Sequence, residues 1–196
     1  YARRLIRKTL KRLLRNDLRR AIALLDAAAV SVNLTWDNTA DPDQAISDLL
    51  LLSEESSGLR PTRVAYGSKS WSIRQSSIRK QDNNGTKASA EWTPAQLAAF
   101  LMVEALSWGE VRYRASAAAL ANYVGSNVYM FNASEGLSEE DPSNLKRFVT
   151  AADGGLDYAV HVDETHPKLN VYYVEHYSLP ALTSPLGIRK AVVAAS

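Results

Sequence analysis

The fold is decided by residues 5–36, which read LIRKTLKRLLRNDLRRAIALLDAAAVSVNLTW and pass from one hydrophobic period to another without a loop. In the first part, apolar residues recur at helical spacing, and Arg12, Arg15 and Arg19 lie on the opposite side. Residues 30–36 then alternate between apolar and polar side chains, which is the pattern of a half-buried strand. The stretch therefore predicts a long amphipathic helix that leads directly into a sheet.

Helix start signals occur twice further along the chain. The motif DPDQ at 41–44 combines an N-cap aspartate, a proline at the first helical position and a glutamine at the third. Gly58 is placed to end this helix. The motif TPAQ at 93–96 repeats the same pattern. We therefore expect helices over 42–57 and 94–102.

The rest of the chain predicts short strands and one more helix. A glycine-serine turn precedes an expected helix over 69–78, and residues 79–92 are expected to form a polar loop. Strands are expected over 63–66, 110–114, 127–131, 145–150, 156–163, 169–177 and 187–193. Those in the last quarter are separated by turn residues, which favours antiparallel pairing. This order of helices and strands predicts an α+β fold.

Charge is distributed unevenly along the chain of 196 residues, which is long enough for one large domain or two small ones. The whole sequence has 23 basic and 21 acidic residues. Residues 1–29 contain nine basic residues and two acidic ones, so the remainder has 14 basic and 19 acidic residues. A helix of charge +7 thus precedes a body of charge −5, which favours contact with nucleic acid or attraction between copies of the chain.

The candidate functional residues are the cations of this helix. Five of these cations are spaced by three or four positions and therefore share one helical face. They are Arg4, Lys8, Arg12, Arg15 and Arg19. We expect this face to contact another subunit or packaged DNA. The alternative is that the apolar face of the helix packs and the cationic face is only solvated.

Several classes of chemistry lack their usual residues. The absence of cysteine excludes disulfides, thiol nucleophiles and cysteine-based metal centres. Neither a glycine-rich phosphate loop nor a G-x-S-x-G motif occurs. No apolar run approaches the roughly 18 residues that a membrane span needs. We therefore expect a protein that is not an enzyme, has no cofactor and does not cross a membrane.

A metal site near the C-terminal end is the remaining catalytic alternative. It would use His161, Asp163 and His166, which lie close together in the sequence. The first two share one face of a predicted strand, and the third is in a predicted turn, so their spacing is not that of a typical set of metal ligands. We expect a hydrated hairpin end and no metal.

The order of elements after residue 36 resembles a known family. Trp36 and Asp37 precede DPDQAI at 41–46, a helix, GLRPTRVAYG at 58–67, and Trp71. This succession is similar to that of the major capsid proteins of tailed bacteriophages, including those of prophages, which have the Hong Kong 97 fold. In that family a long spine helix precedes these elements, as the basic helix does here. The later part of the chain is similar but less distinctive.

The resemblance implies an α+β fold of the Hong Kong 97 type, with a long spine helix, a strand-rich peripheral domain and a mixed α/β axial domain. The peripheral domain would comprise residues 1–40 and 145–196, and the axial domain residues 41–144. The last strand could belong to the axial domain instead of the peripheral one. The family's N-terminal arm and extended loop find no counterpart in these residues, so no cross-linking residue is carried over.

The implied function is that of a structural head subunit, which self-assembles into an icosahedral shell enclosing packaged DNA. Its partners would be copies of itself in hexamers and pentamers, double-stranded DNA, and scaffold or portal proteins. It would be assembled in the host cytoplasm and located in the virion capsid. The alternative is a nucleic-acid-binding protein that uses the basic helix. A helix-turn-helix version is disfavoured because a strand over 30–36 follows that helix.

Overall fold

The computed structural model describes residues 2–37, 39–81, 86–110, 112–114, 120–134, 141–150, 158–166 and 169–195. The helices are α1 (Ala2–Ala28), α2 (Pro42–Ser57), α3 (Ser68–Lys80) and α4 (Pro94–Leu101), and a 3₁₀ helix η1 covers Thr86–Glu91. The first strands are β1 (Val30–Trp36), β2 (Arg63–Gly67), β3 (Ala105–Gly109), β4 (Arg112–Arg114), β5 (Leu120–Asn122) and β6 (Asn127–Phe131). The later strands are β7 (Leu145–Val149), β8 (Ala159–His166), β9 (Leu169–Glu175), β10 (Ser178–Leu182) and β11 (Arg189–Ala195).

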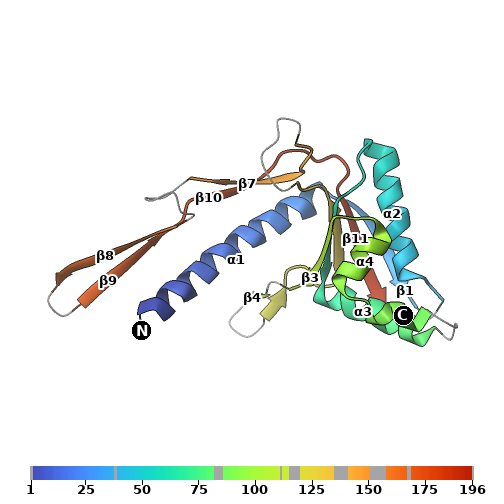
Figure 1. The fold of residues 1–196 in the computed structure, drawn as a ribbon, viewed down its shortest axis with the longest axis horizontal. Coiled ribbons are helices and arrows are strands. Elements are labelled where there is room, and N and C mark those ends of the chain that lie inside the picture. The colour runs from blue at the N-terminus through green and yellow to red at the C-terminus, as the bar shows by residue number, and fades with distance from the viewer. Residues whose placement is uncertain are drawn as a thin grey trace.

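The predicted passage from helix to strand is confirmed. Helix α1 has 27 residues, which corresponds to about 40 Å at 1.5 Å per residue. The amide of Ala29 closes the helix on the carbonyl of Leu25 at 2.9 Å. The next amide, that of Val30, already donates to the carbonyl of Ile188 beside the last strand, at 3.1 Å. The helix therefore extends away from a compact body that begins at its C-terminal end (Figure 1).

A five-stranded sheet forms the centre of this body, with the order β1-β11-β6-β2-β3. Strand β1 is parallel to β11, and β2 is parallel to β3, whereas β6 is antiparallel to both of its neighbours. Alternation along β6 separates the two faces: Val128 and Met130 face the core under the helices, and Tyr129 faces α1. Ile22 and Leu25 of α1 complete the cluster around Tyr129.

The core on the other face is larger and is built from α2, α3 and α4. Its fully buried members include Ile46, Leu50, Leu97 and Leu101. The cap of α2 is as predicted: the Asp41 side chain accepts hydrogen bonds from two backbone amides of the first turn. The start signals in the sequence therefore fix where two of the core helices begin.

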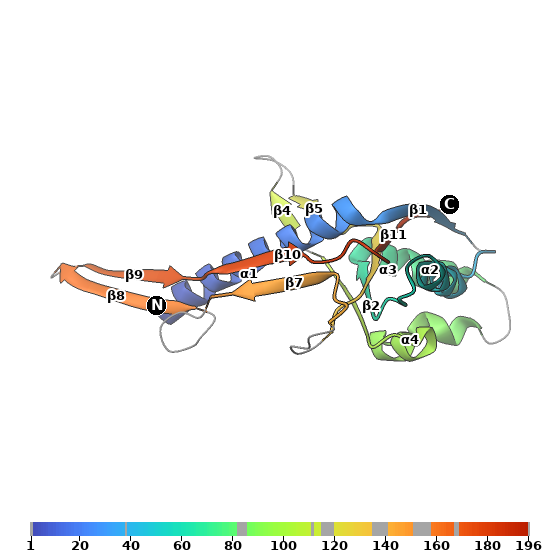
Figure 2. The ribbon, with the colours of Figure 1, turned by 90° about the horizontal axis from the view of Figure 1, so that it is seen from above.

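Two of the antiparallel ribbons in the described part of the chain form an arm outside the body. Strands β7 and β10 pair with each other, and β8 and β9 form a hairpin that extends in the same direction. The two views show this arm running beside α1, and α1 contacts both β9 and β10 (Figure 2). The molecule thus consists of a compact body and a long arm in which a helix lies along a ribbon.

Four details of the sequence prediction were wrong. A strand over 105–109 was missed, and the strand expected over 110–114 is limited to Arg112–Arg114. Strand β3 lacks alternation but pairs in parallel with β2, so its neighbour determines its structure. Strand β10 was also missed because Pro180 argues against a strand, yet proline is tolerated in an edge strand of a two-stranded ribbon. The expected polar loop over 79–92 contains the end of α3 and η1.

The described chain is a mixture of helix and sheet, in agreement with the predicted α+β class. The central sheet takes β1 and β11 from the termini and β2, β3 and β6 from the middle of the chain. The predicted domain division near residues 40 and 145 therefore stays a prediction. Within the described residues, no helix is both long and apolar enough to cross a membrane.

Candidate functional site

The predicted cationic residues occupy one face of α1. Arg4, Lys8, Arg12 and Arg15 are exposed, and Arg19 is half-buried. Because α1 is a continuous helix through all five positions, their spacing of three or four residues places about one cation on each turn. Among the described residues, none of the four exposed cations forms an ion pair or a hydrogen bond through its side chain. This face is thus available to an external anion.

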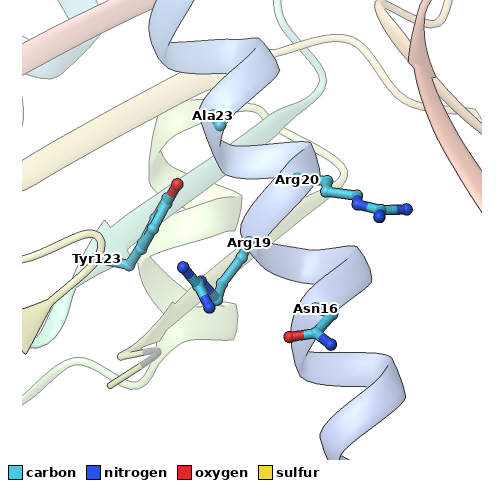
Figure 3. A pocket seen from close by; sticks show the side chains of 5 residues that line it. All are labelled: Asn16, Arg19, Arg20, Ala23 and Tyr123. Carbon is cyan, nitrogen blue, oxygen red and sulfur yellow. The ribbon is translucent and has the colours of Figure 1, made fainter. Parts of the chain in front are cut away.

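These five cations, from Arg4 to Arg19, form a cationic stripe along α1. A pocket lies at the end of this stripe that is nearest the body. It has a volume of 310 Å³ and is lined by Asn16, Arg19, Arg20, Ala23 and Tyr123. The guanidinium of Arg19 lies 5.5 Å from the centre of the Tyr123 ring, which belongs to the segment between β5 and β6. Figure 3 shows Arg19 turned toward Tyr123 and Arg20 pointing to the opposite side. The two cations therefore flank the hollow over the helix surface.

A second hollow continues the pocket along α1. It has a volume of 330 Å³ and shares Ala23 and Tyr123 with the first. Its carboxylate, Asp26, accepts a hydrogen bond from the Tyr129 hydroxyl at 2.8 Å and forms an ion pair with Lys190. Burial alone would raise the pKa of Asp26, but the hydrogen bonds from Lys190 and Tyr129 outweigh it and lower the pKa. The charge of Asp26 is therefore balanced within the chain.

The opposite side of α1 is fixed to the ribbon through Asp17. Its carboxylate lies 2.9 Å from Nε2 of His176 and 3.6 Å from Nε of Arg147, and it accepts a hydrogen bond from the Ser178 hydroxyl. The Asp17 side chain is only 13% exposed. Burial raises its pKa, but the hydrogen bonds from Ser178 and His176 have the larger combined effect and the pKa is lowered. These contacts hold the helix against the ribbon.

The residues of the metal alternative are described only in part. His161 is exposed, with Nε2 3.5 Å from a carboxylate oxygen of Glu175. The side chains of Asp163 and His166 lie outside the described part of the structure. Among the side chains that are described, no group of three potential ligands comes together. The expectation that the chain binds no metal stays a prediction.

Comparison with known proteins gives a structural likeness and no relative in sequence. No family model matches the chain, and no curated protein matches it. The fold resembles that of a phage-related protein. That protein, from Bordetella bronchiseptica, has a crystal structure that matches with a TM-score of 0.63 at 20% sequence identity. The match covers 84% of this chain and 56% of that chain, so this chain spans little more than half of its length.

Sequence reasoning found the stripe but missed most of the pocket. Arg19 was predicted, whereas Asn16 and Arg20 lie just off the face of the other four cations. The adjacent pair Arg19 and Arg20, one turn after Asn16, was a signal that could have been used. Tyr123 had no such signal, since it follows about a hundred residues later and reaches α1 only through the fold. The arrangement can bind an anion between two guanidinium groups.

Proposed function

We propose that the chain is a structural subunit of a tailed-phage or prophage head, a major capsid protein of the Hong Kong 97 type. Copies of it would form hexamers and pentamers of an icosahedral shell that encloses double-stranded DNA. Scaffold and portal proteins would be further partners in assembly, and the product would be the virion capsid. In this role the protein is not an enzyme.

The observation that carries the proposal is the order and arrangement of the elements. A long helix that leads into the central sheet and lies along an antiparallel ribbon matches the succession expected from the family resemblance. The same arrangement extends over 84% of the chain in the comparison with a phage-related protein. Both observations favour a phage structural protein over an unrelated α+β domain.

Exposed apolar residues on the arm support self-assembly. Phe148 of β7 and Leu179 of β10 are directly opposite each other in the ribbon and are 56% and 58% exposed. Leu14 and Leu18 on α1 are also about half exposed. An isolated chain gains nothing by leaving such residues in water, whereas a contact with a second copy would bury them. Contacts of this kind that are heterologous close into rings and shells.

The proposal is tested by assembly of the full-length gene product. We expect negative-stain electron microscopy to show rings or closed particles, and light scattering to show a mass many times that of one chain. A protein that stays monomeric in both measurements, over the whole accessible concentration range, would contradict the proposal. Formation of particles without added DNA would separate this function from nucleic-acid binding.

A further inference from the structure

The pocket at the end of the cationic stripe has the properties of a site for one anionic group. Among the described residues, no carboxylate lines it, and its two charged groups are Arg19 and Arg20. We infer that this pocket binds a phosphate of the backbone of double-stranded DNA. The inference rests on the proposed function only for the source of the ligand, since a phage shell encloses a DNA duplex.

Arg19 is held in place before any ligand arrives. It is half-buried, and its guanidinium lies over the Tyr123 ring at 5.5 Å. A planar guanidinium restrained in this way loses less freedom on binding than a solvated lysine would. It can present two N–H groups to two oxygens of one phosphate. Arg20 adds a second charge from the other side of the hollow (Figure 3).

The other residues of the pocket suit the same ligand. Asn16 is exposed and provides a side-chain amide that can donate hydrogen bonds to a phosphate oxygen. Ala23 has a small side chain, which keeps the surface of the helix open between the two arginines. At 310 Å³ the hollow is large enough for a phosphodiester with its hydration. The pocket thus combines charge, hydrogen-bond donors and space.

The stripe explains why the phosphate would belong to a polymer. From Arg4 to Arg19 the cations extend over about 22 Å of helix axis, with neighbours about 4.5–6 Å apart along it. A DNA duplex presents one negative charge for about every 1.7 Å of its axis, so it can meet several of these cations at once. A free phosphate would occupy the pocket and leave Lys8, Arg12 and Arg15 unpaired.

A carboxylate from a second copy is the competing ligand. Most of the body carboxylates whose side chains the structure describes already have a partner within the chain. Of those whose side chains the structure describes, only Glu55 and Glu91 accept no hydrogen bond and form no ion pair. Two scattered carboxylates do not match a stripe of five cations. The charges on the described residues therefore favour DNA over a second subunit.

The test measures binding of the unassembled full-length protein to a short fluorescent DNA duplex by anisotropy. The variant Arg19→Gln/Arg20→Gln should weaken binding about eightfold near 0.1 M salt, which is the effect of one lost phosphate contact. The slope of log affinity against log salt should become shallower by about 0.9. Circular dichroism checks that the variant keeps its fold.

Two further variants make the result specific to the pocket. Arg79→Gln/Lys80→Gln removes the same charge from two exposed residues in the last turn of α3 and should change the affinity by less than about threefold. Arg19→Lys/Arg20→Lys keeps the charge but loses the planar geometry, and binding should still fall several-fold. The lysine variant also tests the site if the glutamine variant fails to fold.

Three results would overturn the inference. The first is an equal loss of affinity in the α3 control, which would indicate diffuse attraction by net charge. The second is unchanged DNA binding by the glutamine variant with its particle assembly also unchanged. The third is unchanged DNA binding together with loss of particles in electron microscopy without DNA, which would assign the pocket to a contact between copies. Absence of particles from the unaltered protein would contradict only the proposed function.

Discussion

Oδ2 of Asp17 on α1 lies 2.9 Å from Nε2 of His176, a residue 159 positions later at the start of the connection from β9 to β10. The same carboxylate contacts Ser178 and Arg147, so one acidic group joins α1 to both strands of the β7–β10 ribbon. Helix α1 also packs on the body through Ile22 and Leu25 near its C-terminal end, and it contacts β9 and β10 along the arm. Asp17 is therefore a polar contact that holds the helix along the ribbon.

The variant Asp17→Asn should destabilise the protein by about 1–3 kcal/mol at pH 7, because hydrogen bonds to a charged group are replaced by weaker ones. The pKa of Asp17 is lower in the folded protein than its ordinary value of 3.8. Its contribution is therefore present above about pH 4 and is lost as the pH falls through the folded pKa. Urea unfolding of both proteins at pH 7 and pH 3 should show a difference that shrinks in acid.

Asp48→Asn is the matched control for this effect. Asp48 is an exposed carboxylate on α2 whose only described partner is the side-chain amide of Gln44. We expect this variant to change the free energy of unfolding by less than about 0.5 kcal/mol at either pH. A destabilisation by Asp17→Asn that was equally large at pH 3 would show that the carboxylate charge is not the cause.

A second prediction concerns the buried ion pair between α2 and α3. Arg74 is fully buried, and its Nε and one Nη lie 2.5 and 2.7 Å from the two carboxylate oxygens of Asp43. Removal of either partner leaves an unpaired buried charge, so Asp43→Ala or Arg74→Met should each cost about 3–5 kcal/mol. The double variant should cost much less than the sum. A double-mutant cycle from urea unfolding measures this difference, and additive effects would show that the two groups do not interact.

Helix caps could be predicted from the sequence, whereas contacts between residues far apart in the chain could not. The cap at Asp41 and the reciprocal cap of Thr93 and Gln96 use residues two or three positions apart, so local patterns predicted both. Asp43 and Arg74 are separated by 31 positions, and Arg19 and Tyr123 by more than a hundred. Nothing local marks such pairs, and only packing of the elements brings them together.

Strands likewise could be predicted only where the local sequence pattern marks them. The alternation over 30–36 predicted β1 because one face of that strand packs on the core. Strand β3 has no such alternation and is formed by pairing with β2, and β10 contains a proline that only its position in a ribbon permits. The cationic stripe of α1 could be predicted because residues three or four positions apart lie on one face of a regular helix. The contribution of Tyr123 to the pocket could not be predicted in this way.

Gly67 provides a third prediction, which concerns a close approach of two backbone segments. A Cβ atom at this position would lie 2.1 Å from the carbonyl oxygen of Gly125, which accepts hydrogen bonds from the amides of Lys69 and Ser70 at the start of α3. Gly67→Ala should therefore destabilise the protein by about 1–3 kcal/mol, since the loop and the helix must move apart. Thermal unfolding measures the change. Gly109→Ala is the control, because a Cβ there has no neighbour within 4 Å among the described residues, and an equal loss in both variants would contradict this explanation.

The last prediction concerns the apolar surface of the arm. Phe148 and Leu179 are paired across β7 and β10 and are both more than half exposed, so the isolated chain loses little when they become serine. Phe148→Ser/Leu179→Ser should change the free energy of unfolding by less than about 1 kcal/mol. If a neighbouring copy buries both side chains, the same variant loses the hydrophobic free energy of two large side chains at every subunit contact, roughly 1.5–3 kcal/mol for each. Light scattering should then show far fewer large particles.

The control for assembly is Leu51→Ser, which removes a leucine of similar exposure from α2 in the compact body. If the arm provides the contact, this variant should assemble as the unaltered protein does, whereas the ribbon variant should not. Equal loss of particles in both variants would show that assembly depends on total apolar surface. Full assembly of the ribbon variant would show that Phe148 and Leu179 lie outside the contact between copies. Because a shell repeats each contact many times, even a partial loss of free energy per contact should be visible as a large change in particle yield.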